Sequence, residues 1–260
     1  MKKLVLLFVV VSLATASTVF AQSRYQQMVQ IQVAPVHQPA FENYVMKVKE
    51  AADKTESRLN WTTFYVPVGK PEATYRIGLS FDTWAERDQW GTVSAMLTEA
   101  FGEQEAAQIL RAGRVGIVNQ ISRIWERLPD GSSNPRTGGQ PANFYQVMIR
   151  QVDGEMVPEF RSLQRKWKEA YEAVADGPTV GRSILRVGPG SGATFRRAEA
   201  FDTWGERDAW TGRTLTLDHF GAAEQQLIAE TRRRAVESTE SFVSAFRPDL
   251  SRTAASPTSD

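Results

Sequence analysis

The chain shows its first regular pattern between Tyr25 and Ala34, where apolar and polar residues alternate. One side of the alternation carries Val29, Ile31 and Val33. A period of two predicts a β-strand. The stretch Phe144–Val152 keeps the same phase, and we expect a second strand there.

Each of these strands is followed by a stretch with the spacing of an amphipathic helix. Its apolar positions are Phe41, Tyr44, Val45, Val48 and Ala52 in the first half and Phe160, Leu163, Trp167 and Tyr171 in the second. Two further strands are expected in each half, at Trp61–Val68 and Thr74–Phe81 and at Arg182–Val187 and Thr194–Phe201.

A second helix is expected after Asp82 and after Asp202, with Trp90, Val93 and Leu97 on one continuous buried stripe. A last strand closes each half near Gln120–Leu128 and Glu240–Phe246. The order β-α-β-β-α-β is that of the split βαβ or ferredoxin-like unit.

The two halves read as copies of one unit. Phe81–Trp90 is FDTWAERDQW, and Phe201–Trp210, 120 positions further on, is FDTWGERDAW. The same offset aligns Ala73–Arg76 with Ala193–Arg196 and Tyr25 with Tyr145. We therefore expect one repeat at 22–130, a Gly- and Pro-containing linker at 131–142, a second repeat at 143–249 and a disordered tail at 250–260.

With this element order and the repeated Phe-Asp-Thr-Trp junction, the chain resembles a tandem member of the dimeric α/β-barrel superfamily. Single-unit members of that superfamily form the barrel as homodimers. The superfamily includes antibiotic-biosynthesis monooxygenases, EthD-like proteins and haem-binding chlorite dismutases. The resemblance implies an α+β fold of two ferredoxin-like βαββαβ repeats packed as an intramolecular dimeric α/β barrel. It identifies a fold more than a function.

The first 21 residues have the layout of a secretory signal peptide. Lys2 and Lys3 form a basic region, and an apolar run follows at Leu4–Leu13. Val19 and Ala21 occupy the positions before a cleavage site. The run is shorter than the roughly 20 residues of a membrane span, although an uncleaved anchor is the alternative. We expect a periplasmic or secreted protein, cleaved after Ala21, with no membrane partner after cleavage.

Composition excludes several kinds of site and partner. The absence of cysteine excludes disulfides, a catalytic thiol and a thiolate metal site. Loss of Lys2 and Lys3 with the signal peptide leaves 29 basic residues against 30 acidic ones. This near-neutral chain has no basic stripe, so nucleic acid is not an expected partner. Further oligomerisation is left open.

The repeated segment has a folding role at every position. Thr83 with Glu86, and Thr203 with Glu206, fit the capping box at a helix start. A ligand-binding role is the alternative for Trp84 and Trp204, since bulky aromatics near a barrel rim often line its mouth.

Haem would require an axial ligand, and His219 is the one candidate that the sequence offers. The corresponding residue of the first repeat is Ala100, a difference that a one-haem tandem protein would show. A surface or capping histidine is the alternative. Two histidines without cysteine provide no zinc ligand set, so no metal site is predicted.

The clearest difference between the repeats is in charge. Ile77 and Leu79 on the third strand correspond to Arg197 and Glu199. On the second strand, the 120-residue offset aligns Thr62 and Val66 with Arg182 and Arg186. If these faces line the barrel, the four charged residues form either an ion-pair network or an anion-recognising wall.

Two main classes of function remain. The first is an exported barrel that binds a small, partly apolar ligand or acts as an interaction module, because no nucleophile–base pair, phosphate loop or dinucleotide fingerprint is present. The second is a cofactor-free monooxygenase-like enzyme acting on an aromatic substrate. A haem-binding protein is a third reading; the first two need no cofactor. An open cavity with polar groups in the barrel would favour the first two.

Overall fold

The computed structural model describes residues 23–69, 73–134, 136, 141–174, 179–211 and 219–252. The expected signal peptide, residues 135 and 137–140 of the expected linker, and residues 253–260 of the expected tail lie outside these ranges.

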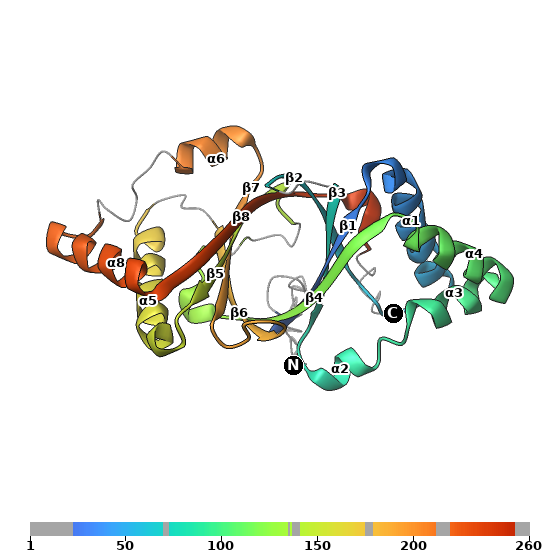
Figure 1. Cartoon of the computed structure of the whole chain (residues 1–260), viewed down its shortest axis with the longest axis horizontal. Helices are drawn as coiled ribbons and strands as arrows, with labels where there is room; N and C mark the ends of the chain where they lie inside the picture. Colours follow the sequence, from blue (N-terminus) through green and yellow to red (C-terminus); the bar gives the residue numbers. More distant parts are fainter. Residues whose placement is uncertain are drawn as a thin grey trace, which may run out of the picture.

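In the described part of the chain, eight strands form one closed barrel in the order β1-β3-β2-β8-β5-β7-β6-β4 (Figure 1). They are β1 (Tyr25–Val33), β2 (Thr62–Val68), β3 (Ala73–Phe81), β4 (Ile117–Arg127), β5 (Phe144–Val152), β6 (Thr179–Val187), β7 (Thr194–Phe201) and β8 (Val236–Phe246). Every neighbouring pair is antiparallel. The first half supplies β4-β1-β3-β2 and the second half β8-β5-β7-β6, so the barrel closes where β2 pairs with β8 and β4 with β6.

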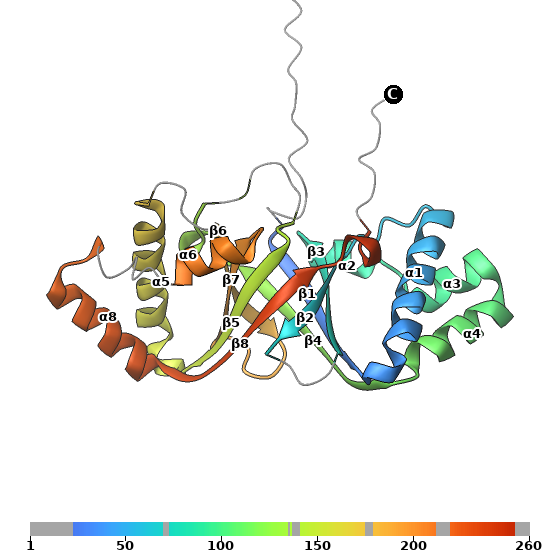
Figure 2. The same ribbon diagram turned by 90° about the horizontal axis from the view of Figure 1, so that it is seen from above.

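Helices cover the outside of the barrel on two opposite sides (Figure 2). The first half contributes α1 (Gln38–Lys54), α2 (Trp84–Asp88), α3 (Val93–Phe101) and α4 (Glu103–Arg114). The second half contributes α5 (Val157–Glu172), α6 (Trp204–Thr211) and α8 (Ala222–Ala235). Single 3₁₀ turns lie at Pro35–His37, Pro129–Gly131, Gly154–Met156 and Pro248–Leu250. No helix in the described ranges is long and apolar enough to cross a membrane.

The helix start after each third strand is the capping box. The Thr83 hydroxyl accepts a hydrogen bond from the Glu86 backbone N–H at 3.2 Å, and the Glu86 carboxylate accepts one from the Asp82 N–H at 2.8 Å. In the second half, Thr203 accepts from the Glu206 N–H at 3.1 Å. These reciprocal bonds satisfy backbone donors that the first helical turn leaves unpaired.

The prediction of one continuous helix stripe through Trp90, Val93 and Leu97 is wrong. The first helix ends at Asp88, and a new N-cap at Thr92 starts α3. Gly91 between them has a φ of +67°, a conformation that glycine adopts readily. Trp90 therefore lies in the connection between two helices, where its ring packs edge-on against Phe81.

The first three residues of the expected tail are buried. Leu250 and Ser251 pack against the first half, and the backbone of Arg252 pairs with that of Trp61. The Arg252 guanidinium donates to the Asp53 carboxylate at 2.7 Å and to the backbone oxygen of Leu59 at 2.6 Å. This C-terminal segment thus fastens the second half of the chain to the first.

Candidate functional site

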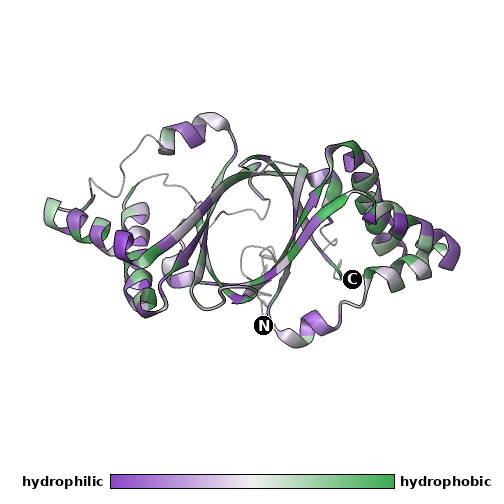
Figure 3. Cartoon of the chain, in the orientation of Figure 1, coloured by the Kyte–Doolittle hydropathy of each residue, from purple (hydrophilic) through white to green (hydrophobic). Residues whose placement is uncertain are grey.

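One face of the strands points into the barrel and forms a core of its own. Its buried members come from six strands of both halves: Met28, Val66, Trp125, Val147, Ile149, Leu185 and Phe242. Residues on strands so far apart around the ring can meet only in the lumen. The strand ribbons carry hydrophilic as well as hydrophobic segments (Figure 3).

A cavity of about 430 Å³ opens from this lumen at the end where β1 and β5 begin. That volume is in the range of sites for drug-sized ligands. Its apolar wall includes Met28, Phe64, Trp125, Tyr145 and Val147; its polar lining includes Gln26, Arg76, Ser183, Arg196 and Ser244. Ser132, Ser133 and Arg136 of the expected linker line the same cavity.

The lining includes six arginines, namely Arg24, Arg76, Arg127, Arg136, Arg182 and Arg196. Two of them, Arg76 and Arg196, lie on opposite sides of the barrel. Arg76 lies on β3 and Arg196 on β7, four places apart in the ring of eight. They are the same position of the two repeats, since each ends an Ala-Thr-aromatic-Arg sequence. Neither forms an ion pair with a described residue, and the side chains to which they donate hydrogen bonds, Ser244, Ser183 and Gln26, are neutral.

Arg196 is held in place by neutral groups. Its Nε donates to the Ser183 hydroxyl at 3.0 Å and its Nη2 to the Gln26 side-chain oxygen at 2.8 Å. The guanidinium also lies 5.1 Å from the centroid of the Trp125 ring. Burial lowers the pKa of Arg196 to about 10.

Arg76 is only 4 % exposed and has weaker support. Its guanidinium lies 4.7 Å from the Phe242 ring centroid and 3.5 Å from the Ser244 hydroxyl, and its Nε has no hydrogen-bond partner. Burial lowers the pKa of Arg76 to about 9, and the positive charge of Arg196 acts in the same direction. Glu240 opposes this shift without reversing it.

Of the arginines that sequence reasoning singled out on β6 and β7, Arg182 contributes to the cavity lining although it lies on the helix side of its strand, and Arg186 and Arg197 do not line the cavity. Arg182 pairs with Arg197 across the two strands, as Thr63 pairs with Ile77 in the first half. Arg182 is therefore the counterpart of Thr63, and the expected alignment with Thr62 is off by one residue. Because a shift of one residue exchanges the faces of a strand, Arg182 points toward the helices.

Under α5, Arg182, Arg197 and Glu199 form a charged cluster with Arg150. Arg197 pairs with Glu199 at 2.8 Å and donates to the Tyr171 hydroxyl at 2.5 Å. Arg182, 2 % exposed, lies against Trp167 and leaves its Nε and Nη1 without a partner. Burial lowers the pKa of Arg182 to about 9, with Arg197 adding to the effect.

Arg186 lies apart from that cluster. It is exposed and pairs with Glu126 of β4 at 2.5 Å, beside the Arg24–Glu126 pair at 3.0 Å. This ion pair spans the β4–β6 seam of the barrel. Arg186 therefore joins the two halves from outside and does not line the cavity.

Trp84 and Trp204 also lie outside the cavity. Each is 41 % exposed. Trp84 packs on Tyr25 and Phe81, and Trp204 packs in the same way on Phe144 and Phe201. The paired stacks show that Phe144, and not Tyr145, is the counterpart of Tyr25, so the first strand is also offset by one residue.

His219 does not lie where it could be an axial ligand of a haem in the lumen. Its side chain is exposed, packs edge-on against Phe220 and does not line the cavity. Within the described ranges, no three histidine, aspartate or glutamate residues are grouped as metal ligands.

Sequence reasoning missed Arg76, Arg196, Trp125 and Tyr145. The signal for the arginines was present, because Ala73–Arg76 and Ala193–Arg196 were aligned as matching segments. The two segments were interpreted only as evidence that the halves are similar. Matching charges on two barrel strands are also candidates for a shared site.

Comparison with known proteins places the chain by fold. No family model and no curated protein matches the sequence. A proposed monooxygenase from Fusobacterium nucleatum superimposes with a TM-score of 0.55 at 11% identity, covering 86% of this chain and 92% of that one. An anthrone oxidase-like protein gives a TM-score of 0.52 at 10% identity, covering 87% and 93%.

A variant chlorite dismutase from Candidatus Nitrospira defluvii, in complex with cyanide, gives a TM-score of 0.50 at 10% identity and covers 89% of this chain and 94% of that one. The chain therefore has an α+β fold around an eight-stranded antiparallel barrel, as these proteins do. The expected resemblance is therefore confirmed as a likeness of fold to these solved structures.

Proposed function

We propose that this protein is an exported, intramolecular dimeric α/β barrel of two ferredoxin-like repeats that binds a small, partly apolar ligand in its lumen. The observation that carries the proposal is the cavity of about 430 Å³, where an apolar wall meets a few convergent polar groups. Such a combination is typical of small-molecule sites.

Blocking the cavity tests this proposal. Ala198 lines the cavity on β7, so Ala198→Phe should fill part of it. A panel of small aromatic compounds, screened by thermal shift and calorimetry, should give ligands that bind the wild type and lose most of their affinity for Ala198→Phe. Ala107→Phe, on the exposed side of α4, is the matched control. Equal binding to all three proteins would place the ligand outside the lumen and refute the proposal.

A second candidate function is cofactor-free oxygenation of an aromatic substrate. It is favoured by two guanidinium groups beside an apolar wall, because positive charge stabilises the phenolate or enolate that donates electrons to oxygen. Anthrone is a suitable probe, since anthrone and O₂ give anthraquinone and water. Oxygen uptake that requires Arg76 would support this candidate; binding without oxygen uptake would leave a binding protein.

Export is proposed from the sequence of residues 1–21. Expression of the full chain with its N-terminus in a bacterial host should give a protein in the periplasm or medium that starts at Gln22. A product that retains Met1 in the cytoplasmic fraction would refute the export proposal and leave the lumen proposal unaffected.

A further inference from the structure

We infer that the lumen selects ligands that carry a carboxylate on a flat apolar body, an inference that rests on ligand binding in the lumen. The starting observation is a charge imbalance. The cavity lining includes six arginines and Lys168 but one carboxylate, Glu172. Among these arginines, Arg76 and Arg196 form no ion pair with a carboxylate of the described residues. A buried cation without a counter-ion is costly, and a bound anion would offset that cost.

The geometry directs both charges toward one space. The two residues stand on opposite strands of the ring, and each lowers the cost of an anion placed between them. Gln26, Ser183 and Trp125 fix the Arg196 side chain. A planar guanidinium that is already held loses little freedom when it binds a carboxylate, which it can grip with two N–H groups.

Arg76 supplies the unused donors. Its Nε is buried without a partner, and its contact with Ser244 is long, at 3.5 Å. An unsatisfied N–H of a buried charged group favours an acceptor on the ligand. Arg76 also lines a second space, shared with Arg123 and Ile121, of only about 10 Å³. That space is too small for an organic ligand, so a ligand acceptor must come from the larger cavity.

The rest of the ligand must be apolar. Met28, Phe64, Trp125 and Val147 form the wall beside the two arginines. Aromatic rings in such a wall favour a flat, preferably aromatic body that stacks or packs edge-on. A free inorganic anion would leave this wall in contact with water, so an aromatic carboxylate fits the lining better than phosphate or sulfate does.

A matched pair of probes tests the inference. 1-Naphthoate and 1-naphthamide share the ring system and differ in charge. Calorimetry with the full mature chain at neutral pH should show naphthoate bound at least tenfold more tightly than naphthamide. Arg76→Gln and Arg196→Gln should each remove most of that preference and leave naphthamide affinity within about twofold. Arg186→Gln, on the outer face, should leave both affinities unchanged.

Each outcome separates the two proposals. If naphthamide binds as tightly as naphthoate to the wild type, the carboxylate inference is overturned and binding in the lumen stands. If neither probe binds and the Ala198→Phe panel also gives no lumen ligand, binding in the lumen is overturned. The ratio of naphthoate to naphthamide affinity is measured on the wild type, so a variant that fails to fold does not prevent the test. A preference that persists in both glutamine variants places the anion elsewhere and also overturns the inference.

Discussion

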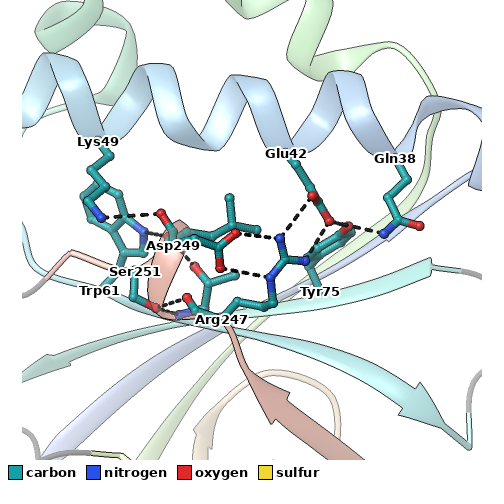
Figure 4. Close-up of polar contacts among 10 residues, drawn as sticks. Gln38, Glu42, Lys49, Trp61, Tyr75, Arg247, Asp249 and Ser251 are labelled. Atoms are coloured by element: carbon teal, nitrogen blue, oxygen red, sulfur yellow. Dashed lines mark hydrogen bonds and ion pairs between the residues drawn. The ribbon is translucent and has the colours of Figure 1, made fainter.

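Replacing Glu42 by Gln will weaken the attachment of the C-terminal segment to the first half of the molecule. Figure 4 shows Glu42 on α1 receiving both arms of Arg247, at 2.8 and 3.1 Å, with Tyr75 and Gln38 donating to the same carboxylate. Arg247 also donates to Asp249 at 2.9 and 2.7 Å. The carboxylate therefore links α1, β3 and the chain after β8.

The magnitude follows from the pKa. The hydrogen bonds from Arg247 lower the pKa of Glu42 from 4.5 to about 2, aided by those from Tyr75 and Gln38 and opposed by burial. A carboxyl whose folded pKa is depressed stabilises the fold above its unfolded pKa. The shift corresponds to about 3 kcal/mol at pH 7, which is lost as the pH falls from about 4.5 to about 2.

Urea unfolding followed by circular dichroism measures this loss. Glu42→Gln should lower the free energy of unfolding by about 3 kcal/mol at pH 7, and the difference from the wild type should shrink to nearly zero by about pH 2. Glu50→Gln is the control, because Glu50 lies on the same helix and pairs only with exposed Lys47 and Lys54. Equal losses in the two variants, or a loss independent of pH, would refute the reasoning.

Two further substitutions test the barrel seam and the cluster under α5. Gly69→Ala should destabilise the protein by about 2 kcal/mol or more, because φ is +93° and a Cβ would come to 2.8 Å from the Ser241 backbone oxygen at the β2–β8 seam. Gly91→Ala is the control, because Gly91 has a φ of +67° and open space around it, and it should lower the free energy of unfolding by only about 1 kcal/mol. Thermal unfolding measures both variants, and equal effects would contradict the steric argument. Arg182→Met should raise the free energy of unfolding by about 1–4 kcal/mol, and with it the melting temperature, because it removes a buried, incompletely paired cation. A lower melting temperature would show that the cation is needed for packing.

The element order was accessible to sequence reasoning because its signals are local. Phe144–Val152 was expected as a strand and is β5, with the same ends. The Thr83 capping box set the start of α2. By contrast, α2 was expected to run on through Trp90, since apolar spacing alone does not register a break of one glycine and one new cap. The burial of Arg252 could not be foreseen, because its partners at Asp53 and Leu59 are distant in sequence.

The sequence could not show which face of each strand lines the lumen, for a physical reason. Barrel strands covered by helices are buried on both sides, so apolar residues on either side do not reveal which one faces the lumen. Alignment at a constant offset of 120 could not decide this either. The pairings Tyr25–Phe81 and Phe144–Phe201 show an offset of 119 on the first strand, while β3 and β7 keep 120. The single-residue difference is invisible in a sequence with so few matching positions.

This offset determines where each kind of difference between the repeats acts. Arg76 and Arg196 occupy matching positions in the sequence and both line the cavity, so the two halves of the chain each contribute one such charge. Arg182 and Arg197 stand where Thr63 and Ile77 stand in the first half, so the layer under α5 carries charges that the first half lacks. The two arginines are arranged nearly symmetrically about the lumen, but the wall beside them is not symmetrical. The cross-strand neighbour of Arg76 is Phe64, whereas that of Arg196 is Ser183. That unevenness gives the lumen a more apolar side at Phe64 and a more polar one at Ser183.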